Sequence, residues 1–333
     1  MYCEQFHLRR RPFELSPDPY FLYPTPRHNE ALANLFHAVS GRRGFVVLTG
    51  EVGTGKTLLL RCLFDLLDRR QVTFAYLFNP RLTAEDFLQH VLGDLGLPAS
   101  LNGKSARLRV LNQYLLERHR RQLTTALVVD EAQHLSPEVL EEIRLLTNLE
   151  TTSQKLLQIV LAGQPELEDQ LDSPGLRQLK QRVALRCRLA PLGEEETHGY
   201  IRRRLDRAAE PGADVGELFP PAALAAIYHA SGGIPRLINT LCENALITAY
   251  AHELPAVTAA IVAEVAADFR LRAPGPEAHG PAADAAPGAA ADGDTRRQMW
   301  ATLLKLAQQL DGREESPADL EWELRSAAKG GAA

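Results

Sequence analysis

Hydrophobic and polar positions follow two different periods between residues 45 and 189. Short apolar runs of strand length alternate with stretches in which apolar residues recur every three to four positions, the spacing of one helical face. Helices are predicted after Lys56, around 84–94, around 105–121 and from Ser136-Pro137 onward. The predicted strands cover residues 45–49, 73–78, 125–129, 157–162 and 184–189. This alternation predicts an α/β domain with a parallel sheet.

The pattern changes after residue 193. From 194 to 271 the period is helical throughout, which predicts a separate small all-α bundle. Ala, Gly and Pro dominate residues 273–294, where no apolar period is left to bury, so a flexible linker is expected there. The expected domains are therefore an α/β domain over 1–192, a helical domain over 193–272, the linker over 273–294 and a tail over 295–333.

The tail carries a weaker helical signal. One predicted helical face holds Met299, Leu303, Leu306 and Leu310, and a second short helix is expected from Ser316-Pro317. An isolated helix of this length is marginal without something to pack on. The tail is therefore either a solvated end or a docking module for a protein partner, and the pattern leaves both readings open.

The composition narrows the class of protein. The chain has 333 residues, of which 45% are apolar, and 37 Lys and Arg against 42 Asp and Glu give a net charge of −5. No apolar run approaches the ~18 to 20 residues that span a bilayer, and the N-terminus lacks the apolar core of a signal peptide, so a cytoplasmic location is expected. The four cysteines show no zinc spacing, and His28 is interpreted with the other histidines as an ordinary surface or core residue.

A phosphate-binding motif lies between the first predicted strand and the helix that follows it. Residues 50–57 satisfy G-x-x-x-x-G-K-[ST] at every position. The glycines let backbone N–H groups turn inward around phosphate oxygens, while a lysine charge reaches the β- and γ-phosphates and a hydroxyl is offered to Mg²⁺. The predicted nucleotide-binding residues are Gly50, Glu51, Val52, Gly53, Thr54, Gly55, Lys56, Thr57 and Leu58.

A pair of acids completes this chemistry. The strand over 125–129 ends in Asp130 and Glu131, and the carboxyl ends of strands in open α/β sheets line the ligand crevice. Asp130 is predicted to hold Mg²⁺ together with Thr57, and Glu131 to act as general base on water. An acidic base directly after the metal-binding aspartate favours hydrolysis over transfer to a small molecule. The predicted cofactors are ATP and Mg²⁺.

Taken together, these elements resemble the AAA+ ATPases. More narrowly, the chain is similar over residues 1–271 to the ExeA/GspA family of general secretion pathway ATPases, with similar proteins in pilus biogenesis and exosortase-linked exopolysaccharide systems. The segments that carry the likeness are MYCEQFHLRRRPFELSPDPYFLY, FVVLTGEVGTGKT, VVDEAQHL, IVLAGQPEL, LKQRVALRCRLAPL and GGIPRLINTLCENAL. The resemblance implies a sheet ordered 5-1-4-3-2, a C-terminal helical lid and ATP hydrolysis coupled to homo-oligomerisation.

The resemblance also implies roles for single residues. Gln164 matches the sensor-1 position, Arg236 the sensor-2 position and Asn79 a residue that restrains the catalytic glutamate. Arg182 matches an arginine finger that acts in a neighbouring subunit, with Arg177 as a second candidate. Each has a plainer reading: Gln164 as a loop residue, Arg236 as a surface residue, Arg182 as part of a solvated basic face and Asn79 as a turn starter.

Three functions compete at this point. The leading expectation is an ATPase that assembles or remodels an envelope-associated secretion, pilus or polysaccharide apparatus, recruited to the inner membrane by a partner. Secretion members of the family continue into a transmembrane helix and a peptidoglycan-binding region, where this chain carries its linker and tail. The alternatives are a DNA-dependent regulator of the transposition type and a nucleotide-gated scaffold with little turnover. The part of the chain before the linker has a net charge near zero, which counts mildly against a DNA-dependent regulator.

Overall fold

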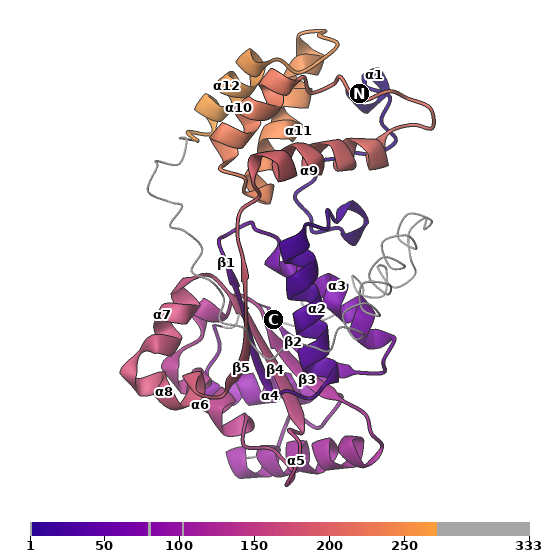
Figure 1. Cartoon of the computed structure of the whole chain (residues 1–333). Coiled ribbons are helices and arrows are strands. Elements are labelled where there is room, and N and C mark those ends of the chain that lie inside the picture. The colour runs from indigo at the N-terminus through magenta and orange to yellow at the C-terminus, as the bar shows by residue number, and fades with distance from the viewer. Residues whose placement is uncertain (1, 79–80, 102, 272–333) are drawn as a thin grey trace. The chain divides into compact units, whose positions relative to one another are not determined.

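The computed structural model describes residues 2–78, 81–101 and 103–271, which belong to one compact unit (Figure 1). Asn79, the predicted linker and the predicted tail helices lie outside these described residues. Within the described part, no helix combines the length and the apolar character needed to cross a membrane.

A single five-stranded sheet forms the centre of the α/β part described here. Every neighbouring pair of strands is parallel, and the order is β2-β3-β4-β1-β5, the order that the family resemblance implied. The strands are β1 (Phe45–Gly50), β2 (Thr73–Leu77), β3 (Thr125–Val129), β4 (Leu157–Gly163) and β5 (Val183–Leu189). All residues of β1, β3 and β4 are buried, as expected for strands covered on both faces.

Helices cover both faces of the sheet. On one face, Phe45, Val47, Leu127 and Ile159 belong to a core shared with helices α4 to α7, while α2 and α3 pack together and against the sheet. These helices are α2 (Pro26–Ser40), α3 (Lys56–Asp68), α4 (Ala84–Asp94), α5 (Lys104–Arg120), α6 (Pro137–Leu146), α7 (Glu166–Asp172) and α8 (Arg177–Lys180). The α/β domain with a parallel sheet predicted from the sequence is therefore confirmed, and its helices and sheet form three layers.

Local signals explain the helix starts. Thr83 and Ser136 are N-caps whose side chains accept hydrogen bonds from the first turns of α4 and α6, and Pro137 occupies the first position of α6. The helix α2 over residues 26–40 is not among the predicted elements, although Ala31, Leu35 and Ala38 recur on its buried face. That period of three to four was a usable signal for the helix.

The bundle consists of α9 (Glu194–Ala208), α10 (Pro221–Ser231), α11 (Pro235–Ala251) and α12 (Ala259–Asp268). The N-terminal segment, with α1 (Tyr2–Gln5), contributes Phe6, Phe13 and Phe21 to the core of this bundle. Leu8 also forms an antiparallel bridge with Ala209. Although the chain begins in the region expected to be α/β, its first apolar side chains are buried among the helices that come last in the described sequence.

Candidate nucleotide-binding site

The phosphate loop joins β1 to α3 in a conformation that requires glycine. Gly53 and Gly55 have φ angles of 81° and 97°, in the left-handed region that other residues avoid. A Cβ atom at Gly53 would lie 2.6 Å from the Cβ of Arg236, so the loop and the start of α11 are in close contact. The loop leads into the N-terminus of α3, where unpaired backbone N–H groups and the helix dipole favour an anion.

Lys56 is held inside this loop. Its side chain is 5% exposed, and its Nζ donates hydrogen bonds to the backbone oxygens of Gly50 at 2.8 Å and Glu51 at 3.0 Å. Burial lowers the pKa of Lys56, while the nearby charges of Glu131 and Asp130 act in the opposite direction. Because both hydrogen-bond acceptors are neutral carbonyls, the ammonium group keeps its attraction for a phosphate.

The two predicted metal ligands lie side by side. Thr57 Oγ1 donates a hydrogen bond to Asp130 Oδ2 at 2.7 Å, and the Tyr76 hydroxyl approaches the same oxygen at 3.4 Å. Burial raises the pKa of Asp130, against the hydrogen bond from Thr57, which lowers it. A hydroxyl and a carboxylate in contact at the mouth of a phosphate loop are the oxygen donors that Mg²⁺ prefers, so these residues fit that ion.

Glu131 is held in an unusual backbone conformation. Its φ angle is 51°, which a residue with a side chain adopts at a cost. Its Oε2 accepts hydrogen bonds from Gln133 Nε2 at 2.6 Å and from Gln164 Nε2 at 3.4 Å. Burial alone would raise the pKa of Glu131, but these two hydrogen bonds and the charge of Lys56 outweigh it and lower the pKa. The carboxylate is therefore ionised near neutral pH, as a general base must be.

Gln133 is a part of the site that the sequence analysis missed. It is 8% exposed, and its Oε1 accepts a hydrogen bond from the Gln164 backbone N–H at 3.0 Å. Its backbone oxygen accepts from Gln170 Nε2 at 2.8 Å, and a Cβ atom at Gly163 would lie 2.9 Å from Gln133 Oε1. Gln133 thus connects the ends of β3 and β4. The only available signal was a glutamine two residues after Glu131, between the buried Ala132 and the exposed His134.

His28 is a second missed contact. Its Nδ1 lies 2.7 Å from Thr25 Oγ1 and its Nε2 3.2 Å from the backbone oxygen of Thr54. Because Thr25 Oγ1 already accepts the His28 backbone N–H, the hydroxyl proton is directed to Nδ1, and we assign the ring proton to Nε2, which donates to Thr54. Burial lowers the pKa of His28, although the hydrogen bond to Thr54 opposes the shift. The first turn of α2 therefore supports the phosphate loop.

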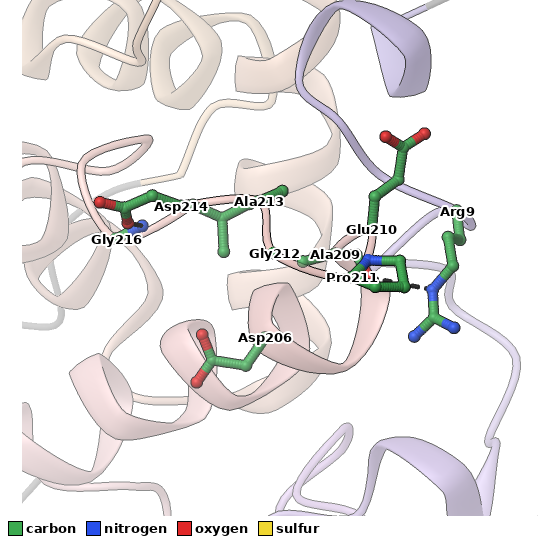
Figure 2. Close-up of a pocket in the computed structure, with 10 residues that line it drawn as sticks. Arg9, Asp206, Ala209, Glu210, Pro211, Gly212, Ala213, Asp214 and Gly216 are labelled. Atoms are coloured by element: carbon green, nitrogen blue, oxygen red, sulfur yellow. Dashed lines mark hydrogen bonds between the residues drawn. The ribbon is translucent and has the colours of Figure 1, made fainter.

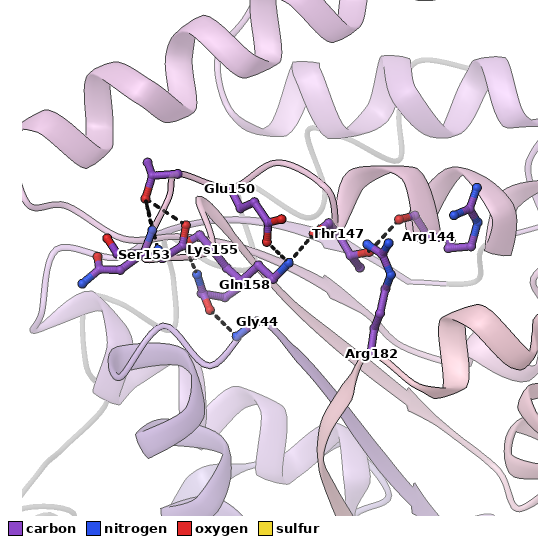
Figure 3. A network of polar contacts seen from close by, with 10 residues as sticks. Gly44, Arg144, Thr147, Glu150, Ser153, Lys155, Gln158 and Arg182 are labelled. Carbon is purple, nitrogen blue, oxygen red and sulfur yellow. Dashed lines mark hydrogen bonds and ion pairs between the residues drawn. The ribbon is translucent and has the colours of Figure 1, made fainter.

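The two predicted arginines occupy different places. Arg236 is the second residue of α11; its backbone N–H donates to Gly53 O at 3.2 Å, and its side chain is exposed beside the phosphate loop. Arg182 precedes β5, and its Nη1 donates to Thr147 Oγ1 at 2.5 Å, at the end of α6 (Figure 3). The structure thus brings together Lys56, Thr57, Asp130, Glu131, Gln164 and the backbone of Arg236, and holds Arg182 elsewhere.

A cavity of about 470 Å³ lies apart from this site. The loop from Ala209 to Gly216 between α9 and α10 lines most of it, with Arg9 closing one side through a hydrogen bond from Nε to Ala209 O at 2.9 Å (Figure 2). It contains neither the phosphate loop nor the acid pair, so we do not assign the nucleotide to it.

The chain is similar in sequence to known proteins. The family model described as an AAA domain matches residues 39–171. General secretion pathway protein A of Aeromonas hydrophila is 46% identical over 255 residues, which cover 75% of this chain and 45% of that protein.

The chain carries an AAA domain and is a relative of general secretion pathway protein A. The resemblance to the general secretion pathway ATPases that the sequence motifs indicate is therefore confirmed. The chain spans less than half of that relative's length, so the activity and partners of the whole relative enter below only as proposals.

Solved structures share the fold. The Aeropyrum pernix ORC2 protein, in ADPNP-ADP complexes, superposes with a TM-score of 0.56 and 16% identity over 78% of this chain and 71% of that one. The structure of Drosophila ORC bound to DNA gives a TM-score of 0.58 and 16% identity over 96% of this chain and 84% of that one. At this level of identity the likeness establishes the fold alone.

Proposed function

We propose that this chain is a Mg²⁺-dependent ATPase whose nucleotide cycle drives its own oligomerisation and the assembly or remodelling of an envelope-associated apparatus. The observation that supports hydrolysis most directly is the contact between Thr57 and Asp130 beside Glu131, opposite a buried lysine in a phosphate loop. The name of its relative, general secretion pathway protein A, supports the envelope setting.

Each side chain has a task in this proposal. Bound Mg²⁺ would neutralise charge on the β- and γ-phosphates. Thr57 and Asp130 would hold that ion, and Lys56 would turn from its loop carbonyls to the phosphate oxygens. Glu131 would accept the proton of the attacking water, with Gln164 orienting that water from the end of β4. Arg236 would reach the γ-phosphate from α11 and carry its loss into the helical lid.

Arg182 would act on a neighbouring subunit. Its hydrogen bond to Thr147 holds the guanidinium at the end of α6, away from the phosphate loop of its own chain. An arginine placed there can stabilise phosphoryl charge only across an interface, which would make hydrolysis depend on assembly.

One set of variants tests this function. Lys56→Ala should lose nucleotide binding, whereas Glu131→Gln should bind ATP and hydrolyse it about 10²- to 10⁴-fold more slowly. Arg182→Ala should bind ATP but turn over poorly, and mixing it with Glu131→Gln subunits should restore part of the rate. Arg109→Ala, an exposed change on α5, is the control. Unchanged ATP affinity in Lys56→Ala would refute the site, and no recovery at any mixing ratio would refute action across an interface.

A further inference from the structure

In the α/β part, closely spaced arginines lie at or just after the ends of three helices, immediately before the next strand. Because the strands are parallel, the turns that precede them meet at one edge of the sheet, opposite the edge with the phosphate loop. We call this surface the basic edge and define it by the turns over 41–44, 68–72, 118–124 and 150–155. Its arginines are Arg42, Arg43, Arg69, Arg70, Arg118, Arg120 and Arg121.

Hydrogen bonds show that the four turns form one surface. Arg42 Nη1 donates to Gln154 Oε1 at 2.8 Å, and Arg42 Nε lies 3.4 Å from Thr124 Oγ1. Arg118 Nη2 donates to the backbone oxygens of Thr124 at 2.8 Å and Gln71 at 3.1 Å. Arg42 and Arg118 are half-buried, and these contacts give them a structural role. Figure 3 shows the fourth of these turns, 150–155, where Lys155 pairs with Glu150.

Three other arginines of the basic edge have no such contacts in the described part of the chain. Arg43, Arg70 and Arg120 are exposed, one on each of three turns, and Arg121 is exposed beside Glu117, with which it forms an ion pair. The basic edge holds eight Lys and Arg residues against two Asp and Glu residues, in a chain whose net charge is −5. Positive charge is thus concentrated on one face.

The helix dipole does not account for this concentration. Basic residues are favoured within the last turn of a helix, and the effect falls off beyond it. Arg120 lies in the last turn of α5, but Arg43 follows the end of α2 at Ser40, and Arg70 follows the end of α3 at Asp68.

We propose that the basic edge is a docking surface for an anionic lipid bilayer. The turns lead into four adjacent strands, which at the usual strand spacing spreads the arginines over roughly 15 Å along one edge of the sheet. Single-stranded nucleic acid is bound on exposed aromatic side chains, and the large exposed hydrophobic residues of the described chain, among them Phe78 and Phe269, lie outside these turns. Charge without exposed apolar anchors fits a membrane surface, which is recognised through its negative potential.

This surface goes beyond the proposed ATPase function and does not depend on it. Arginine near an anionic leaflet strengthens binding about fivefold per residue, and the attraction fades within a Debye length. Loss of three arginines should therefore weaken membrane binding on the order of 100-fold. The phosphate loop lies at the opposite edge, so hydrolysis without lipid should not change.

The test is sedimentation of the full chain with vesicles of phosphatidylcholine alone or with about 30 mol % phosphatidylglycerol. The variant Arg43→Gln, Arg70→Gln, Arg120→Gln removes one exposed arginine from each turn. The matched control Arg109→Gln, Arg202→Gln, Arg270→Gln removes three exposed arginines from elsewhere. A third variant, Arg43→Lys, Arg70→Lys, Arg120→Lys, keeps the positive charge. Thermal melting verifies that each variant is folded. If the triple glutamine variant is not folded, the single variant Arg120→Gln takes its place.

Wild type, the control and the lysine variant should bind only the anionic vesicles, and the glutamine variant should lose that binding. Binding should also weaken when ionic strength rises from about 0.1 M to about 0.5 M. Equal binding by wild type and the glutamine variant, equal loss in the control, or no preference for anionic vesicles would overturn it. A duplex DNA is tested in parallel. If wild type binds this DNA more tightly than the vesicles and the glutamine variant does not bind it, the basic edge is a nucleic-acid surface instead.

Discussion

The two edges of one parallel sheet place charged groups in opposite ways. At the carboxyl edge, Lys56, Asp130 and Glu131 are wholly or partly buried and held by hydrogen bonds in fixed positions. At the amino edge, Arg43, Arg70 and Arg120 are exposed on separate turns. A buried charge depends on its exact partners, whereas an exposed charge acts through its sign and its distance from others. We therefore expect substitutions at the first edge to depend on geometry and at the second on charge.

Among the residues that support the catalytic groups at the carboxyl edge, Gln133→Ala has the largest expected effect. This change removes the 2.6 Å hydrogen bond to Glu131 and leaves the partly buried Gln164 N–H without its acceptor. A small displacement of a catalytic group costs up to about 100-fold in rate, so turnover at saturating ATP should fall by ten- to 100-fold while ATP affinity holds. Gln178→Ala on exposed α8 is the control. If affinity falls and turnover does not, Gln133 does not position Glu131.

A smaller effect is expected from Gly53→Ala. The left-handed backbone costs about 1–2 kcal/mol once a Cβ is present, and this Cβ also meets Arg236 at 2.6 Å. Gly96→Ala is the matched control, because Gly96 has a φ of 72° but no neighbour within 4 Å. Melting temperatures should fall in both variants and further in Gly53→Ala, and only Gly53→Ala should also weaken nucleotide binding. Equal shifts would show that the contact between the loop and α11 contributes nothing.

The smallest effect concerns the pH dependence of stability through His28. Burial lowers its pKa in the folded chain, so the unfolded chain takes up the proton first. The stability that His28 contributes is complete above its ordinary pKa of about 6.5 and is lost as pH falls from that value through the lower pKa of the folded chain. His28→Gln removes the titration, so the gap in melting temperature between wild type and variant should narrow on acidification. His90→Gln, at an exposed position, should show no such narrowing.

Much of the fold and of the phosphate-binding residues could be predicted from the chain alone. The five strands, the capped starts of α4 and α6 and the loop that ends in Lys56 all depend on neighbours within a few residues. Gln133 and His28 could not be assigned in this way, since the first is linked to Gln164 and the second to Thr54 only after the strands and helices pack. The domain boundaries and the roles of Arg182 and Arg236 remain predictions.

The sequence by itself determined which segments became strands and helices and which stretch could wrap a phosphate, because periodicity, caps and glycine positions act over short distances. Only the tertiary structure decided that the N-terminal aromatic residues share a core with α9 to α12, and that arginines from three distant turns meet on one surface. Such meetings arise because parallel strand pairing and the burial of apolar faces bring together positions that no local pattern connects.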